Sequence, residues 1–153
     1  MKKIFAFTLL AVTYHVCPAF EGQIQFNASK DAVEHNILLS QWKHGPKGAI
    51  SFDYVYSHKG STCQFEAKGQ VNAVLDAKGK PTAETWVDDD GKPIGRTWIF
   101  SGDNESINFP AKPTDLLKFF GFGMQLPADA GKRGCFKNAR DIDVVFRNGS
   151  VVK

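Results

Sequence analysis

The sequence predicts a mainly β protein, an antiparallel barrel or sandwich of about seven or eight short strands with one N-terminal helix, or an α+β variant of that plan. Apolar and polar residues alternate from residue 50 onward, which is the period of half-buried strands. Clusters rich in Asp, Gly, Lys and Pro interrupt this alternation at intervals typical of hairpins. The 153 residues fit one domain in size.

The N-terminal segment has the pattern of an export signal. Lys2 and Lys3 precede an uncharged apolar run, residues 4–13, and then Cys17-Pro18-Ala19. We expect cleavage after Ala19, which divides the chain into a signal peptide (1–19) and one domain (20–153). The protein is then exported to the periplasm or secreted, and the short basic start is typical of bacteria. The apolar run is shorter than the roughly 20 residues of a membrane-spanning helix. A lipoprotein anchored through Cys17 is the alternative, disfavoured because the two preceding residues are not small.

The net charge of the chain is informative once the signal is set aside. Lys and Arg number 19 and Asp and Glu 16, a formal net charge of +3. Two of the lysines belong to the signal, so the exported domain would carry a net charge of +1. Nothing in this balance predicts nucleic acid as a partner.

The first elements of the domain combine a strand and a helix. Residues 23–26 alternate as a short strand does. The next segment, Lys30 to Lys43, is predicted to be a helix, with Asn27 or Ser29 as its N-cap. Its apolar face would hold Val33, Ile37, Leu38 and Trp42.

Strands follow from residue 50. Ile50, Phe52, Tyr54 and Tyr56 share one face of the first of them. Turn clusters separate the later ones, because Gly and Asp accept tight-turn geometry and Pro ends a strand. The expected strands are 50–57, 63–75, 82–87, 96–100 and 106–109, and the breaks are 58–61, 76–81, 88–93 and 102–104.

The C-terminal part allows two interpretations at one point. Thr114 could cap a short helical turn through Phe120, or residues 120–124 could form a strand with a bulge. Beyond the loop 131–134 we expect closing strands at 135–138 and 142–146. Asn148-Gly149 then turns the chain into a last short strand.

Cys63 and Cys135 are the two cysteines left after cleavage, and we predict that they form a disulfide. A bridge across this separation would stabilise the domain by about 4 kcal/mol in the chain-entropy model. A catalytic or metal-binding thiol is the alternative, but neither cysteine lies in a CxxC motif or beside a histidine.

No motif predicts a metal or a cofactor. His35, His44 and His58 lack metal-ligand spacing, and His44 and His58 are expected in solvated turns. The acidic run Asp88-Asp89-Asp90-Gly91 fails as a calcium loop, because Trp86 would take the first ligand position. We therefore expect neither a bound metal nor a cofactor.

Charge and aromatic residues supply the weak binding candidates. Residues 84–105 carry a net charge of −4 and residues 132–153 one of +4, which favours either a charged partner or pairing between the two segments. Around two glycines, Phe119, Phe120 and Phe122 would form a contact surface if their segment were a loop. Lys132 and Arg133 are the basic candidates.

The function predicted from these observations is that of an exported, non-enzymatic binding module. It would act through contact with an envelope or extracellular protein, or hold a small apolar ligand. One alternative is a small secreted hydrolase that uses the carboxylates Glu66, Glu84 or Glu105. A lipid carrier with a cavity of at least about 300 Å³ is the other.

Overall fold

The described residues form a single antiparallel sheet of ten strands. The computed structural model describes residues 22–30, 32–61, 64–87, 90–126 and 141–152. The mainly β, antiparallel prediction is confirmed, with more strands than expected and without closure into a barrel. The strands are β1 (Gln23–Lys30), β2 (Val33–His44), β3 (Ile50–Lys59), β4 (Gln64–Ala73), β5 (Ala83–Val87), β6 (Pro93–Ser101), β7 (Glu105–Pro110), β8 (Phe119–Gln125), β9 (Asp141–Arg147) and β10 (Ser150–Val152). Two short 3₁₀ turns, η1 (Pro46–Gly48) and η2 (Pro113–Asp115), complete the described elements.

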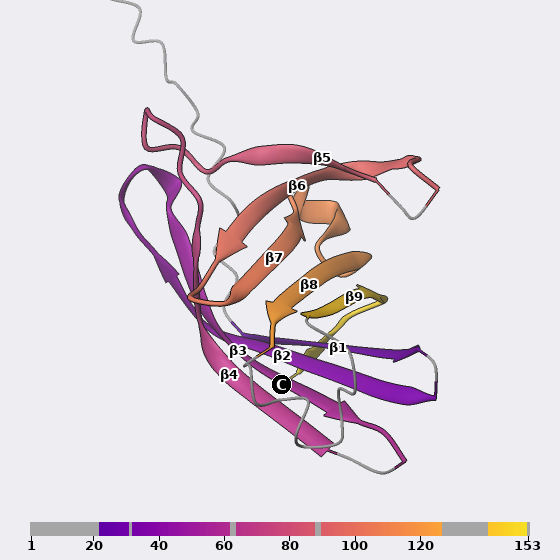
Figure 1. Cartoon of the computed structure of the whole chain (residues 1–153). Coiled ribbons are helices and arrows are strands. Elements are labelled where there is room, and N and C mark those ends of the chain that lie inside the picture. The colour runs from indigo at the N-terminus through magenta and orange to yellow at the C-terminus, as the bar shows by residue number, and fades with distance from the viewer. Residues whose placement is uncertain (1–21, 31, 62–63, 88–89, 127–140, 153) are drawn as a thin grey trace, which may run out of the picture.

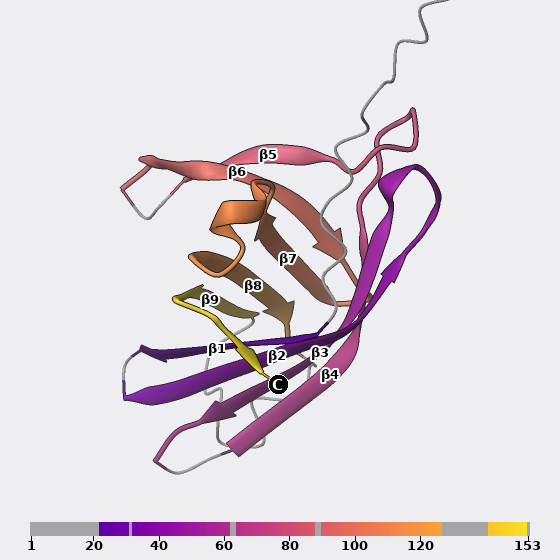
Figure 2. The same ribbon diagram turned by 180° about the vertical axis from the view of Figure 1, so that it is seen from behind.

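The sheet coils back on itself in two layers. Its order is β10-β1-β2-β3-β4-β6-β7-β8-β9, with β5 paired to β6 outside this path. In Figure 1 the long strands β1–β4 form one layer and β6–β9 curl over it, while β5 and the start of β6 extend beyond as a separate ribbon. Only two residue pairs join β4 to β6, so the sheet turns sharply between the layers. In the reverse view of Figure 2, the yellow C-terminal segment lies beside β1. Its last strand, β10, pairs with β1.

The N-terminal helix is absent from the described part of the chain, and that prediction was wrong. Its segment forms β2, which pairs with β1 on one side and β3 on the other. Register shifts between Ser40 and Lys43, and Gln41 has a φ of 54°. Such a bulge puts Leu39 and Trp42, three residues apart, on the same inner side. Because of the bulge, inward residues of this strand are three positions apart, which is also the spacing of residues on one face of a helix.

Aromatic rings fill the space between the two layers. Phe26 stacks on Phe120 at a centroid distance of 5.2 Å, and Tyr56 stacks on Phe122 at 4.6 Å. Both contacts join the β1–β4 layer to β8. The fully buried large side chains are Ile24, Phe26, Ile37, Leu39, Phe52, Tyr54, Tyr56, Phe100, Ile107, Phe120, Phe122 and Phe146. The described interior is thus a packed core, and the face predicted to be shared by Ile50, Phe52, Tyr54 and Tyr56 is confirmed, with all four buried.

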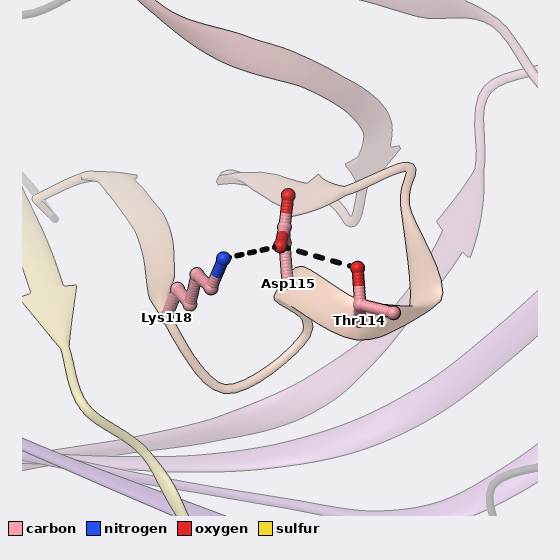
Figure 3. Close-up of polar contacts among 3 residues, drawn as sticks. All are labelled: Thr114, Asp115 and Lys118. Atoms are coloured by element: carbon pink, nitrogen blue, oxygen red, sulfur yellow. Dashed lines mark hydrogen bonds and ion pairs between the residues drawn. The ribbon is translucent and has the colours of Figure 1, made fainter.

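Of the two alternatives left open for residues 114–124, the strand is the one that forms, because β8 covers Phe119–Gln125 and the helical turn η2 is limited to Pro113–Asp115 and does not run through Phe120. The 3₁₀ turn η2 is followed by β8, and polar contacts hold its end (Figure 3). Lys118 Nζ lies 2.7 Å from Asp115 Oδ1, which also accepts a hydrogen bond from the Thr114 hydroxyl at 3.3 Å. The hydrogen bond from Lys118 holds the pKa of Asp115 below its ordinary value. These contacts lie on the surface of the turn that precedes β8.

The other expected strands lie close to their predicted positions. The break expected at 58–61 comes later, because β3 continues through His58 to Lys59. Asp76 closes the next turn, where its Oδ1 accepts hydrogen bonds from the backbone N–H groups of Lys78 and Lys80. Of the predicted closing strands, 142–146 is β9, whereas 135–138 lies outside the described residues. None of the described helical elements has the length and apolar character needed to cross a membrane.

Candidate functional site: an open groove on the outer face of β7, β8 and β9

The two faces of β8 differ in the size of their side chains. Phe120, Phe122 and Met124 point into the core and are buried. The alternate residues Gly121 and Gly123 lie on the outer face, where they carry no side chain. The outer surface of β8 is therefore bare backbone at two successive positions.

Gly121 is required by its neighbour. A Cβ at this position would lie 2.7 Å from Cζ2 of Trp86, so the indole rests directly on the strand. Trp86 also packs on Phe119, with ring centroids 5.4 Å apart. Phe119 also lies beside Gly95, the register partner of Trp86 on β6, where a Cβ would be in ordinary contact with the ring at 3.4 Å. This aromatic pair docks the β5–β6 ribbon onto β8.

Gly123 has no comparable packing reason. Among the described residues, a Cβ there would meet only the carbonyl oxygens of Ser106 and Ile142, at the ordinary distances of 3.7 and 3.9 Å. A glycine inside a strand lowers stability relative to residues with side chains and is common where another group approaches the backbone closely. What the glycine provides at this position is an open floor.

The hollow around this floor is a groove of about 800 Å³ that opens to solvent. The register places Ser106 and Asp143 on either side of Gly123, and Asn108 and Val145 on either side of Gly121. A bulge between Trp86 and Val87 lies at the aromatic end, where such irregularities often redirect a side chain. The volume lies within the range of ligand-binding clefts.

Charge is unevenly distributed along the groove. Four carboxylates and one guanidinium are among its lining residues: Asp103, Glu105, Asp141, Asp143 and Arg147. Asp141 is paired with Gln125 at one end of β8, next to the β6–β7 turn, while Arg147 is paired with Phe119 at the other end. The groove thus has an acidic end and an aromatic end with one cation.

The carboxylates of the groove are accessible to a ligand. Asp103, Asp141 and Asp143 are exposed, and Glu105 is half-buried. One oxygen of Glu105 accepts a hydrogen bond from the backbone N–H of Asn104, so this side chain also shapes the β6–β7 turn. Exposed carboxylates attract cations without first losing their own hydration, which suits binding.

The three predicted phenylalanines lie in β8 and are buried. Phe120 and Phe122 are completely covered in the core, and Phe119 is 6% exposed under Trp86. Their strand is not the loop that exposure would have required. Their binding role stays a prediction. Phe122 is the one of the three among the residues that line the groove, and Phe119 contacts the groove residue Trp86.

Several other predicted site residues fall outside the described part of the chain. These are the proposed disulfide partners Cys63 and Cys135, the basic candidates Lys132 and Arg133, and the lipidation candidate Cys17. The bridge, the basic surface and the export signal therefore stay predictions. No group of three or more potential metal ligands occurs among the described residues.

The histidines in the described ranges divide into one exposed and two buried residues. His44 is exposed at the end of β2, as expected. His58 is 8% exposed within β3, so its predicted place in a solvated turn was wrong. His35 lies beside it with ring centroids 5.2 Å apart, and its Nδ1 shares a hydrogen bond of 2.8 Å with the Tyr56 hydroxyl. Burial lowers the pKa of both imidazoles. The nearby ring of His58 lowers the pKa of His35 further.

The glutamates of the hydrolase alternative are separated by the fold. Glu66 is exposed on β4 and Glu84 on β5, whereas Glu105 alone of the three lines the groove. Residues 84–105 and 132–153, the two segments of opposite net charge, both contribute acidic residues to the groove. Asp103 and Glu105 of the acidic segment lie in the same groove as Asp141 and Asp143, which belong to the segment with net positive charge.

The sequence reasoning missed Trp86, Gly121, Gly123, Asp141 and Asp143 as site residues. One signal was present, since Phe120-Gly121-Phe122-Gly123-Met124 alternates large and absent side chains with the period of a strand. In a strand, this pattern means that one face is core and the other is bare. The contribution of β9 depends on pairing across the sheet and has no local signal.

Comparisons with known proteins found no match among family models, curated proteins or solved structures. What the geometry defines is a coiled antiparallel β protein with an open, acidic, glycine-floored groove on its outer surface.

Proposed function

We propose that the protein is an exported, non-enzymatic binding module whose ligand lies in the groove over β7, β8 and β9. The observation that carries this proposal is Gly123, a strand glycine that no neighbour within the described part of the chain requires and that leaves the floor open. Trp86 at one end and exposed carboxylates at the other offer an aromatic contact and charged contacts within one hollow. Such a combination is typical of recognition surfaces.

The apolar-ligand and lipid-carrier alternatives receive less support. Rings from both layers occupy the described interior, with contacts such as Phe52 to Phe100 at 4.9 Å. The hollow of about 800 Å³ is instead open and has carboxylates on its lining. Charged groups at the surface of a cleft are costly to cover with an acyl chain.

Glycine amide signals provide a direct test. In ¹⁵N–¹H correlation spectra, Gly121 and Gly123 report on the groove, and Gly69 on β4 serves as a remote control. Three probes represent the ligand classes: a lysine-containing peptide, chitotriose and laurate. We expect one probe to shift the groove glycines saturably while Gly69 stays in place. Shifts confined to core residues, or no saturable shift with any probe, would refute the proposal.

The same samples test the hydrolase alternative. Incubation with the peptide or chitotriose is followed by mass spectrometry of the probe. Intact probe is expected with a binding module. Turnover that is lost on changing Glu105 to Gln would replace the binding function with a catalytic one.

A further inference from the structure

We infer that the ligand of the groove is an extended, basic segment of a partner protein, with basic residues at two alternate positions and an apolar residue at the next. This inference rests on the proposed function and specifies its partner. It follows from the order of side chains along β9 and from the groove beside them.

The outer face of β9 presents four residues in order. Asp141, Asp143, Val145 and Arg147 all point outward, and all four line the groove. Successive members are two residues apart, about 7 Å along a strand. The lining along β9 therefore runs acidic, acidic, apolar, basic.

Neighbouring strands add like residues beside the acidic and the apolar positions of β9. Asp103 and Glu105 of the β6–β7 turn add negative charge at the acidic end, where Gln125 N–H donates to the Asn104 carbonyl oxygen at 2.9 Å. Val145 is 38% exposed, in the same row of the sheet as Gly121 and the indole of Trp86. Ligand specificity thus combines attraction at one end with an apolar contact in the middle.

An extended polypeptide matches this spacing. Its alternate side chains share one face and repeat at about 7 Å, the same interval as the groove positions. Lysine or arginine at two alternate positions would lie beside Asp143 and Asp141, with the aliphatic stems over the bare floor at Gly123. An apolar residue would follow on Val145 and Trp86, and a cation at the fourth position would be repelled by Arg147.

A neutral oligosaccharide matches the groove less well. Trp86 could stack on a sugar ring and the sugar hydroxyls could donate hydrogen bonds, but a neutral sugar brings no cation to balance the four carboxylates. A free polyamine would satisfy the carboxylates but leave the apolar position unused. Of these three ligand classes, only the basic segment contacts both the carboxylates and the apolar position at Val145.

The test uses peptides with a defined order of charges. The matching peptide is Lys-Ser-Lys-Ser-Leu-Ser-Glu, acetylated and amidated, together with its reverse sequence, since the chain direction is not specified by side-chain spacing. The control peptide, Glu-Ser-Glu-Ser-Leu-Ser-Lys, exchanges the charges. Spermidine and chitotriose represent the two other ligand classes. Binding is followed by the groove glycine shifts and by tryptophan fluorescence, with Trp86→Phe identifying the contribution of that indole.

Charge-matched variants separate a local effect from a general one. Asp141→Asn with Asp143→Asn removes two charges from the groove, while Glu66→Gln with Glu84→Gln removes two exposed charges elsewhere. We expect one of the two matching peptides to bind about tenfold more weakly to the first variant and unchanged to the second. Its affinity should also fall as salt is raised.

Several results would overturn the inference. Equal binding of the charge-exchanged peptide would remove the role of the carboxylates. Spermidine binding as tightly as the peptide, with the same dependence on Asp141 and Asp143, would make the ligand a free polycation. If chitotriose alone shifts Gly121 and Gly123, the inference fails while the proposed groove function stands.

Discussion

The inner and outer faces of β8 are made by alternate residues of one seven-residue strand, yet one face packs in the core and the other forms the floor of the groove. The inner face, Phe120, Phe122 and Met124, is closed by rings from the opposite layer. The outer face at Gly121 and Gly123 has no side chains and is covered only partly, by Trp86. Burial therefore determines the residues of one face of the strand, whereas the residues of the other face are free to form a binding site.

The largest effect is expected on the inner face. Phe122→Ala removes a ring that contacts Tyr54 and Tyr56 and is completely buried, so it should lower the free energy of unfolding by about 3–5 kcal/mol. Urea unfolding measures this loss. Phe122→Leu, which keeps most of the volume, should lose less, and a Phe122→Ala loss below about 1 kcal/mol would show that packing at this position is unimportant.

The two outer glycines should respond differently to the same change. Gly121→Ala forces a Cβ against Trp86, and the resulting overpacking should cost about 1–3 kcal/mol. Gly123→Ala meets only ordinary contacts and should change stability by no more than about 0.5 kcal/mol. Urea unfolding of both variants, with tryptophan fluorescence for the position of the indole, checks this pair. Similar losses at both glycines would contradict a floor that is free at Gly123.

The buried histidines predict how stability depends on pH. Their pKa values in the folded state lie below the ordinary 6.5, so the unfolded chain takes up protons first. The stability that they contribute is complete above pH 6.5 and is lost as the pH falls from 6.5 through the lowered folded values. Urea midpoints between about pH 7.5 and about pH 5 measure this loss.

Two variants give this pH dependence its controls. His35 faces His58, the Tyr56 hydroxyl and the charge of Lys30, so His35→Gln should flatten the dependence. His44→Gln changes an exposed imidazole and should leave it as it is. A dependence that is unaltered by His35→Gln would assign the acid sensitivity to other groups.

The smallest effect is expected at the turn before β8. Lys118→Ala removes the ion pair with Asp115 shown in Figure 3, in which the lysine is largely exposed. Exposed pairs contribute little, and the backbone hydrogen bonds of the turn remain. The urea midpoint should stay close to that of the unaltered protein. A large loss would mean that this contact, more than the core, positions β8.

The strands could be predicted where burial acts on every second residue. Ile50, Phe52, Tyr54 and Tyr56 are an example, because each inward residue is apolar. The segment of β2 could not, since its bulge at Gln41 changes the phase of the pattern and mimics a helix. His58 illustrates a related difficulty, because a polar residue before Gly60 resembles a turn in sequence but is buried by pairing with His35.

The groove was less predictable than the fold for a physical reason. Trp86, Gly123 and Asp143 come from three strands that are distant in sequence and are brought together by sheet order. Their residue types are ordinary individually, and exposed positions follow no burial pattern. Only the alternation of Phe and Gly in β8 carried local information about the site.

Filling the floor of the groove tests the central claim most directly. The measurement is the dissociation constant of the matching lysine peptide for Gly123→Leu, with Gln64→Leu on exposed β4 surface as the control for an added leucine. We predict binding at least about tenfold weaker for Gly123→Leu, unaltered binding for Gln64→Leu, and similar urea midpoints for both. Undiminished binding by a stable Gly123→Leu protein would contradict the claim that this groove holds the ligand.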